Sequence, residues 1–183
     1  MGLTNVDEAP GLPDAVEKIR AHLSSLPEGK TSVTFRAATR LDRGLTTRAR
    51  IRKFNLTIDE PAELGGGNEG PNPVEVFLAA FGTCQEIVYA VYAAAHGVRL
   101  ERLEIDVEGD LDPRGFFGVA DVTPGLSAVR FRVRIESAAA PERIAELVDL
   151  VSRRCPVLDI LQRPVPVSGT VELNGRSLGL SAA

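Results

Sequence analysis

Apolar residues recur at every third or fourth position in three stretches of the chain, which is the spacing of helices that bury one face. These stretches cover residues 13–26, 73–96 and 141–154. The middle stretch is so apolar that we expect its helix to be buried on most sides. The three apolar stripes comprise Val16, Ile19, Leu23 and Leu26; Phe77, Ala80, Phe81, Cys84, Ile87, Val88, Val91 and Ala95; and Ile144, Leu147, Val148 and Val151.

Strict alternation of apolar and polar residues predicts strands around these helices. It occurs in residues 33–37, at the end of an extended region over 44–58, in 103–108 and in 129–135. A short helix to about Leu161 and a last strand with Val165, Val167 and Val171 complete the chain. The mixture of helices and strands predicts one α/β (α+β) domain.

Two of the predicted strands carry opposite charges on their polar faces, and opposite charges stabilise strands that lie side by side. We therefore interpret them as antiparallel neighbours and reject a basic RNA-binding stripe. The charged residues are Glu104, Asp106 and Glu108 in one strand and Arg130, Arg132 and Arg134 in the other.

Length and charge limit the possible organisation and partners. The 183 residues suit a single core, with an arm (loose to about Pro13) and amphipathic helix over 1–30, and the main domain over 31–183. A net charge of −4 does not favour nucleic acid or an anionic membrane as a partner. The N-terminus lacks the pattern of a secretory signal, and Glu75, Gln85 and Glu86 interrupt the apolar stretch, which argues against a membrane span. We expect a cytoplasmic protein.

The glycine-rich segment DEPAELGGGNEGPNP, residues 59–73, is not typical of a phosphate-binding loop. It has neither the lysine and hydroxyl residue of a P-loop nor the spacing of a dinucleotide fingerprint. We interpret it as a connector that enters the central helix. Asn72 can cap that helix, Pro73 suits its first turn, and Glu75 stands at the acidic position of a capping box.

The chain has two cysteines, Cys84 and Cys155, and both could be structural thiols. In a reducing compartment they are not expected to form a permanent disulfide. A thiol reacts as its thiolate. Cys155 precedes Pro156 and can sit at a helix N-terminus, where the helix dipole favours an anion. Cys84 lies mid-helix without such help and would need a cation, such as an arginine from another element. Physical reasoning alone leaves open which cysteine attacks.

Two segments resemble the OsmC/Ohr family of osmotically inducible and organic hydroperoxide resistance proteins. DEPAELGGGNEGPNPVEVFLAAFGTC is similar to the family signature, and RRCPVLDILQRPVPV is similar to its second cysteine segment. The order of elements is similar over residues 31–173, and the loop GDLDPRGFFGVADVTPG resembles a less characterised sub-branch.

The resemblance implies an intertwined homodimer in which antiparallel sheets wrap around long central helices. It also implies a thiol peroxidase in which Cys84 attacks an organic hydroperoxide and becomes a sulfenic acid. Cys155 would condense with it to a disulfide, which an external dithiol reduces. No metal or organic cofactor is implied, and His22 and His96 lie too far apart in sequence to suggest a zinc site.

The family uses an arginine and a glutamate to hold the reactive thiolate. Arg48 is the first candidate for the arginine, with Arg43 and Arg50 behind it. The peroxidase pattern has its glutamate directly after the proline, where this chain has Val74, and Glu75 follows one position later. On a regular helix Glu75 and Cys84 are about 14 Å apart along the axis and roughly half a turn apart around it. Glu75 could therefore assist only across a bend or from a partner subunit, and its capping position explains it equally well.

Phe116 and Phe117 could line a pocket for an apolar peroxide, although packing at a dimer interface is the favoured interpretation. Glu86 lies on a different helix face from Cys84 and is not expected to be its partner.

The leading hypothesis is a hydroperoxide reductase that uses Cys84 and Cys155. The alternative is a dimer that kept the fold, lost efficient chemistry and binds a small apolar ligand, and the absence of an acid at position 74 motivates it. Two sulfurs in contact and an arginine near Cys84 would favour the enzyme. A thioredoxin-like oxidoreductase is excluded because the cysteines are 71 positions apart and form no C-x-x-C motif.

Overall fold

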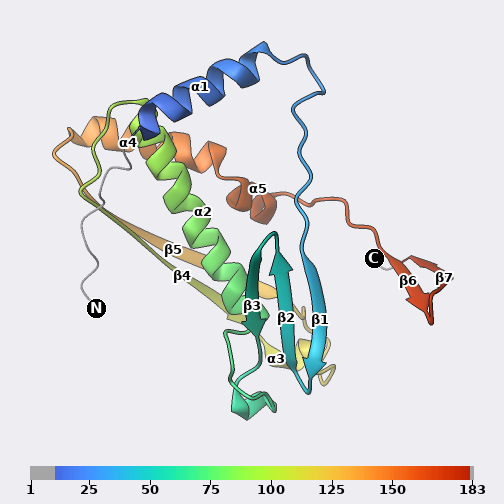
Figure 1. Ribbon diagram of the computed structural model, residues 1–183. Helices are drawn as coiled ribbons and strands as arrows, with labels where there is room; N and C mark the ends of the chain where they lie inside the picture. Colours follow the sequence, from blue (N-terminus) through green and yellow to red (C-terminus); the bar gives the residue numbers. More distant parts are fainter. Residues whose placement is uncertain (1–10, 182–183) are drawn as a thin grey trace.

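The computed structural model describes residues 11–181 and has the expected mixture of helices and antiparallel sheets (Figure 1). Most of the expected N-terminal arm lies outside the described residues. The elements in chain order are α1 Leu12–Ser25, β1 Ala38–Arg43, β2 Thr46–Ile51, β3 Phe54–Ile58, the 3-10 helix η1 Ala62–Leu64, α2 Pro73–Ala95, β4 Arg102–Leu111, α3 Pro113–Phe116, β5 Leu126–Glu136, α4 Pro141–Arg154, α5 Pro156–Gln162, β6 Thr170–Leu173 and β7 Arg176–Ser181.

The strands of the described chain form three antiparallel sheets, in the orders β1-β2-β3, β4-β5 and β6-β7. The predicted pairing of acids with arginines is confirmed, because Glu104 lies opposite Arg134, and the other two acids of β4 lie opposite arginines of β5 in the same register. Arg134 also bridges its neighbours on β4, with nitrogens 3.2 Å from Glu104 and 2.6 Å from Asp106.

The core lies between α2, the β4–β5 sheet and the pair α4 and α5 (Figure 1). One cluster surrounds the C-terminal half of α2 and includes Tyr89, Ala93, Leu147 and Val151. A second cluster lies one to two turns earlier on α2 and contains buried Phe81, Cys155 and Leu158, with Cys84 and Val88 packed against it. Both clusters therefore use α2 as their common wall.

The buried face of α2 differs from the predicted stripe. Gln85 and Gly82 are buried, whereas Ala80 is exposed and Ile87 is 64% exposed. Both sides of α2 are apolar, so its periodicity could not decide which side meets the sheet. In the described part of the chain, α2 is the helix long and apolar enough to cross a membrane by length and composition. Here it packs against β4, α1, α4 and α5.

One predicted strand was wrong, and the last predicted strand begins later than expected, since Val171 lies in β6 but Val165 and Val167 do not. Val33 and Phe35 are 73% and 90% exposed in an extended segment before β1, and Val165 and Val167 lie outside strands, before β6. A segment with alternating residues becomes a strand only if another strand pairs with it. In the described chain, residues 33–37 and 165–167 have no such partner. The extended region 44–58 is a hairpin of β2 and β3, which turns at Arg52 with φ 55°. On α1, Val16 is buried, but Ile19 and Leu23 are exposed.

Candidate functional site

The predicted start of α2 is confirmed in detail. The side chain of Asn72 accepts a hydrogen bond from the Glu75 N–H (2.8 Å), and the Glu75 carboxylate accepts one from the Asn72 N–H (2.7 Å). Pro73 occupies the first turn. This capping box fixes the helix that carries Cys84.

Asp59 holds the glycine-rich loop that precedes α2. Its side chain is 1% exposed and accepts hydrogen bonds from the N–H groups of Glu60 (2.9 Å), Gly67 (3.0 Å) and Glu69 (3.2 Å) and from Thr46 Oγ1 (3.3 Å). Burial alone would raise the pKa of Asp59, but these hydrogen bonds outweigh it and lower the pKa. No pattern in the sequence predicts this buried carboxylate.

The glycines of the same loop allow close approach of backbones. A Cβ on Gly66 would lie 1.8 Å from the Glu60 carbonyl oxygen, and one on Gly70 would lie 2.2 Å from that of Thr57. Both distances are impossible contacts, so the glycine run is required by packing of the loop against itself and β3.

The fold brings Cys84 and Cys155 together although 71 positions separate them. Their Sγ atoms are 3.6 Å apart, and both cysteines are free thiols. Cys84 is partly exposed, whereas Cys155 is 1% exposed at the junction of α4 and α5. The Cys155 N–H donates to Val151 (2.9 Å) and its carbonyl accepts from Asp159 (3.0 Å), so both helices hold its backbone.

The electrostatics differ from what the sequence suggested. Burial raises the pKa of Cys84, and the Cys155 thiol raises it further. The backbone N–H of Val157 opposes this by donating to the Cys84 sulfur. The expectation that a mid-helix Cys84 receives no help from a helix N-terminus was therefore wrong, since the first turn of α5 supplies it. Cys155 is the N-cap residue of α5 as predicted, but its side chain makes no capping hydrogen bond.

The three candidate arginines lie on the β1–β3 sheet and are not among the groups that act on the Cys84 thiol. Arg48 contacts Asp42 (3.1 Å), Thr57 and Glu69 (4.0 Å). Arg43 pairs with Glu69, and Arg50 is exposed on β2 opposite Asn55. Within one described chain, the structure does not bring Arg48 to Cys84.

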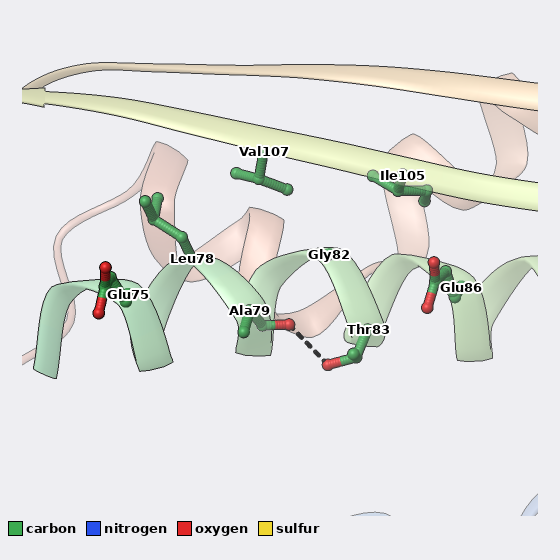
Figure 2. A pocket seen from close by; sticks show the side chains of 8 residues that line it. All are labelled: Glu75, Leu78, Ala79, Gly82, Thr83, Glu86, Ile105 and Val107. Carbon is green, nitrogen blue, oxygen red and sulfur yellow. Dashed lines mark hydrogen bonds between the residues drawn. The ribbon is translucent and has the colours of Figure 1, made fainter. Parts of the chain in front are cut away.

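Glu75 likewise stays away from Cys84 and lines a groove between α2 and β4 instead. Figure 2 shows Glu75 and Glu86 at opposite ends of the α2 segment that runs alongside β4. The groove has a volume of about 430 Å³ and is lined by Glu75, Leu78, Ala79, Gly82, Thr83, Glu86, Ile105 and Val107. Burial raises the pKa of Glu86, and the Ile105 N–H, which donates to it, partly offsets this.

Sequence reasoning missed this groove, although one signal was present. Glu75 and Glu86 are eleven residues apart, close to three helical turns, and so project from the same face of α2. Cys84 does not line the groove. It projects from roughly the opposite side of the helix, which agrees with the prediction that Glu86 is not its partner.

The two free thiols in contact beside an apolar central helix define a class of dithiol proteins in which a partly exposed cysteine faces a buried one. A family model described as OsmC-like protein matches residues 66–169, and the chain belongs to this family. The match includes both cysteines and Glu75 but not Arg48.

Individual relatives agree with this assignment. A hydroperoxide reductase of Mycoplasma genitalium is 31% identical over 112 residues, which is 59% of this chain and 72% of the relative. The crystal structure of an OsmC-like protein from Mycoplasma pneumoniae has a TM-score of 0.63 at 22% identity, covering 73% of this chain and 91% of that one. An organic hydroperoxide resistance protein of Vibrio cholerae, with captopril bound in one active site, has a TM-score of 0.54 at 19% identity, covering 83% and 100%. The likeness to these structures shows the shared fold.

Proposed function

We propose that this protein is a thiol peroxidase that reduces organic hydroperoxides through Cys84 and Cys155. The observation that carries the proposal is the 3.6 Å contact between a partly exposed and a buried sulfur. The exposed member of such a pair can meet a peroxide, and the buried member can only meet its neighbour. The hydroperoxide reductase among the relatives supports the same chemistry.

The reaction proceeds in three steps. The Cys84 thiolate attacks the terminal oxygen of the hydroperoxide, the O–O bond breaks, and the alkoxide leaves as an alcohol after protonation. The Cys155 thiolate then attacks the sulfenic sulfur of Cys84, and hydroxide leaves as water. An external dithiol reduces the resulting disulfide. The chain's own residues supply this chemistry without a cofactor.

The raised pKa of Cys84 requires a cation that a single chain does not deliver. We expect a second copy to deliver it, with Arg48 as the first candidate. Arg48 is 41% exposed, and its ion pairs with Asp42 and Glu69 are surface pairs, which typically contribute about 0–1 kcal/mol and can be exchanged. Glu75 of a second copy is the corresponding candidate for the acid.

Exposed apolar surface supports the homodimer. Ile87 stands on an uncovered side of α2, and Phe35 precedes β1, whose six residues are all exposed. The β6–β7 hairpin stands apart from the rest of the chain (Figure 1). Apolar surface of this extent on ordered elements marks an interaction site, and a second copy that covers α2 and pairs with the free strands would bury it.

The test follows both thiols after addition of one equivalent of cumene hydroperoxide to the reduced protein. Two thiols and two mass units should be lost within seconds, and Cys84→Ser should abolish the loss. Cys155→Ser should stop at a sulfenic acid that dimedone traps. Survival of both thiols for minutes would refute the peroxidase.

A second candidate, a dimer that binds a small apolar ligand, is favoured by Val74 at the family's acidic position and by the raised pKa of Cys84. Unreactive thiols together with saturable binding of an apolar fluorescent probe to the dimer would favour this candidate.

A further inference from the structure

The groove between α2 and β4 is not a reaction site in the mechanism proposed above. It has a volume of about 430 Å³, and Cys84 is not among the residues that line it. Small residues keep it open where α2 passes β4. A Cβ on Gly82 would lie 3.2 Å from Cγ2 of Val107, and the exposed Ala79 adds a single methyl group. The open space therefore follows from the small side chains at these two positions of α2.

The walls of the groove are apolar. Leu78 belongs to α2, and Ile105 and Val107 belong to β4. Side chains of a strand alternate between its two faces, so the acids of β4 point away from α2. The arginines of β5 lie opposite those acids in the same register, and they also point away from α2. In the described chain, the β4–β5 sheet thus contributes apolar surface to the groove and no cation.

Each end of the groove has a carboxylate (Figure 2). Glu86 is partly buried, which raises its pKa, and the Ile105 N–H that donates to it lowers the pKa. No cation of the described residues acts on Glu86. At the other end, Oε2 of Glu75 accepts the Asn72 N–H, which in the described chain leaves Oε1 for a further donor. Eleven residues of helix separate the two acids by about 16 Å along the axis.

We propose that this groove binds an elongated apolar molecule with a primary ammonium group at one end. The ammonium pairs with Glu86, and the chain lies against Ile105 and Val107 and extends toward Glu75. This binding site does not rest on the proposed peroxidase, because Cys84 projects from roughly the opposite side of α2.

The charge of the ligand follows from Glu86. A primary ammonium donates up to three hydrogen bonds and neutralises a carboxylate whose burial disfavours its charge. An uncharged apolar ligand would remove more water from Glu86 without replacing it, and that desolvation is costly. A fatty acid would add a second negative charge beside the first. The groove therefore selects an amphiphilic amine over an alcohol or a fatty acid of the same length.

The test measures binding of three twelve-carbon probes to the full-length protein by isothermal titration calorimetry at pH 7. Dodecylamine has one ammonium group, dodecanoate has a carboxylate, and 1,12-diaminododecane has an ammonium group at each end. We expect one dodecylamine to bind per chain, and dodecanoate to bind at least about tenfold more weakly, because it cannot donate to Glu86. The diamine should bind more tightly than dodecylamine, because its second ammonium reaches Glu75.

Four variants assign the site. Glu86→Gln removes the charge but keeps an oxygen for the Ile105 N–H, and it should weaken dodecylamine binding about tenfold or more, the typical effect of losing one charge-assisted hydrogen bond. Glu75→Gln can keep the capping box and should lower the affinity of the diamine to that of dodecylamine. Ala79→Phe fills the groove and should weaken all three probes. Ala80→Phe, an exposed neighbour that does not line the groove, is the matched control.

Equal affinities for dodecylamine and dodecanoate, or native affinity in Glu86→Gln, would overturn the inference. A second copy seated in the groove would overturn it too. The native protein would then bind no probe, and Ala79→Phe, but not Ala80→Phe, would change the oligomeric state in sedimentation. Glu86→Gln tests the charge even if Ala79→Phe does not fold. The peroxidase fails separately, since Cys84→Ser should bind dodecylamine like the native protein.

Discussion

Val157 donates its backbone N–H to the sulfur of Cys84, so the first turn of α5 serves a cysteine of another helix. Cys155, the N-cap residue of α5, directs its own sulfur to within 3.6 Å of Cys84. The two thiols thus meet beside one helix terminus, and the Cys155 thiol raises the pKa of Cys84.

Cys155→Ala should lower the pKa of Cys84, because the Cys155 thiol raises it in the native protein. The rate of alkylation of Cys84 by iodoacetamide, followed by mass spectrometry, should then reach its midpoint at a lower pH. Ser152→Ala on the exposed side of α4 serves as control and should not move the midpoint. An upward shift in Cys155→Ala would contradict the coupling.

Arg48→Ala should reduce the rate at which Cys84 reacts with cumene hydroperoxide at pH 7 by about tenfold or more, because one opposite charge typically lowers a pKa by about 1–3 units. Stopped-flow measurement of thiol loss checks this. Arg132→Ala, an exposed arginine of β5, should have little effect. Equal rates in the native protein and Arg48→Ala would remove Arg48 from the site and direct attention to Arg43 and Arg50.

Ile87→Glu should shift the protein toward monomer, raising the dissociation constant of the dimer at least about tenfold, because burial of an unpaired charge is strongly unfavourable. The side chain is 64% exposed in the single chain, so the substitution should leave the fold of each chain intact. Sedimentation at several concentrations tests this, with Ile19→Glu on α1 as the comparison. If Ile87→Glu sediments like the native protein, this side of α2 does not lie in the dimer interface.

Asp59 should make stability depend on pH in the acid range. Its pKa is lowered in the folded state, so its contribution to stability is complete above the ordinary pKa of about 4 and is lost as the pH falls through the lowered value. Asp59→Asn should lower the thermal midpoint at pH 7 and flatten its dependence below pH 4. A loss of stability that is equal at pH 7 and pH 3 would show that the charge of Asp59 contributes nothing.

Gly70→Ala should lower the thermal midpoint by roughly 2–12 °C, since forced overpacking typically costs about 1–3 kcal/mol and each kcal/mol shifts a protein of this size by about 2–4 °C. The added Cβ would lie 2.2 Å from a backbone oxygen of Thr57, which cannot move aside cheaply. Gly125→Ala, where a Cβ meets nothing within 4 Å, is the matched control. Equal midpoints for the two variants would show that the loop can shift.

The parts of the fold that the sequence predicted are those in which one local pattern decides. The capping box at Asn72, the register of β4 and β5, and the helix after Cys155 all depend on neighbours in sequence or on facing charges. The strand expected at 33–37 was wrong because pairing needs a partner, which periodicity cannot supply. The buried residues of α2 differ from the predicted stripe, because an almost wholly apolar helix has no polar side that would determine which side faces the core.

The same distinction between local patterns and distant contacts applies to the candidate site. The resemblance to a family supplied the two cysteines, and the structure adds their contact, the Val157 donor and the buried Asp59. None of these additions leaves a mark in the sequence, because each depends on segments far apart along the chain. Within one chain neither Arg48 nor Glu75 acts on Cys84, so their roles, and the second copy that could bring them to it, stay predictions.

The contact between α2 and the α4–α5 junction has a consequence for the lifetime of the protein. A covalent bond between the two sulfurs would enclose a loop of about 70 residues, and closing such a loop restricts the unfolded chain enough to stabilise the fold by about 4 kcal/mol in the chain-entropy model. The oxidised molecule would then open more rarely and resist proteases better than the reduced one. Exposure to oxidant would thus lengthen the survival of each copy until a reductant released it.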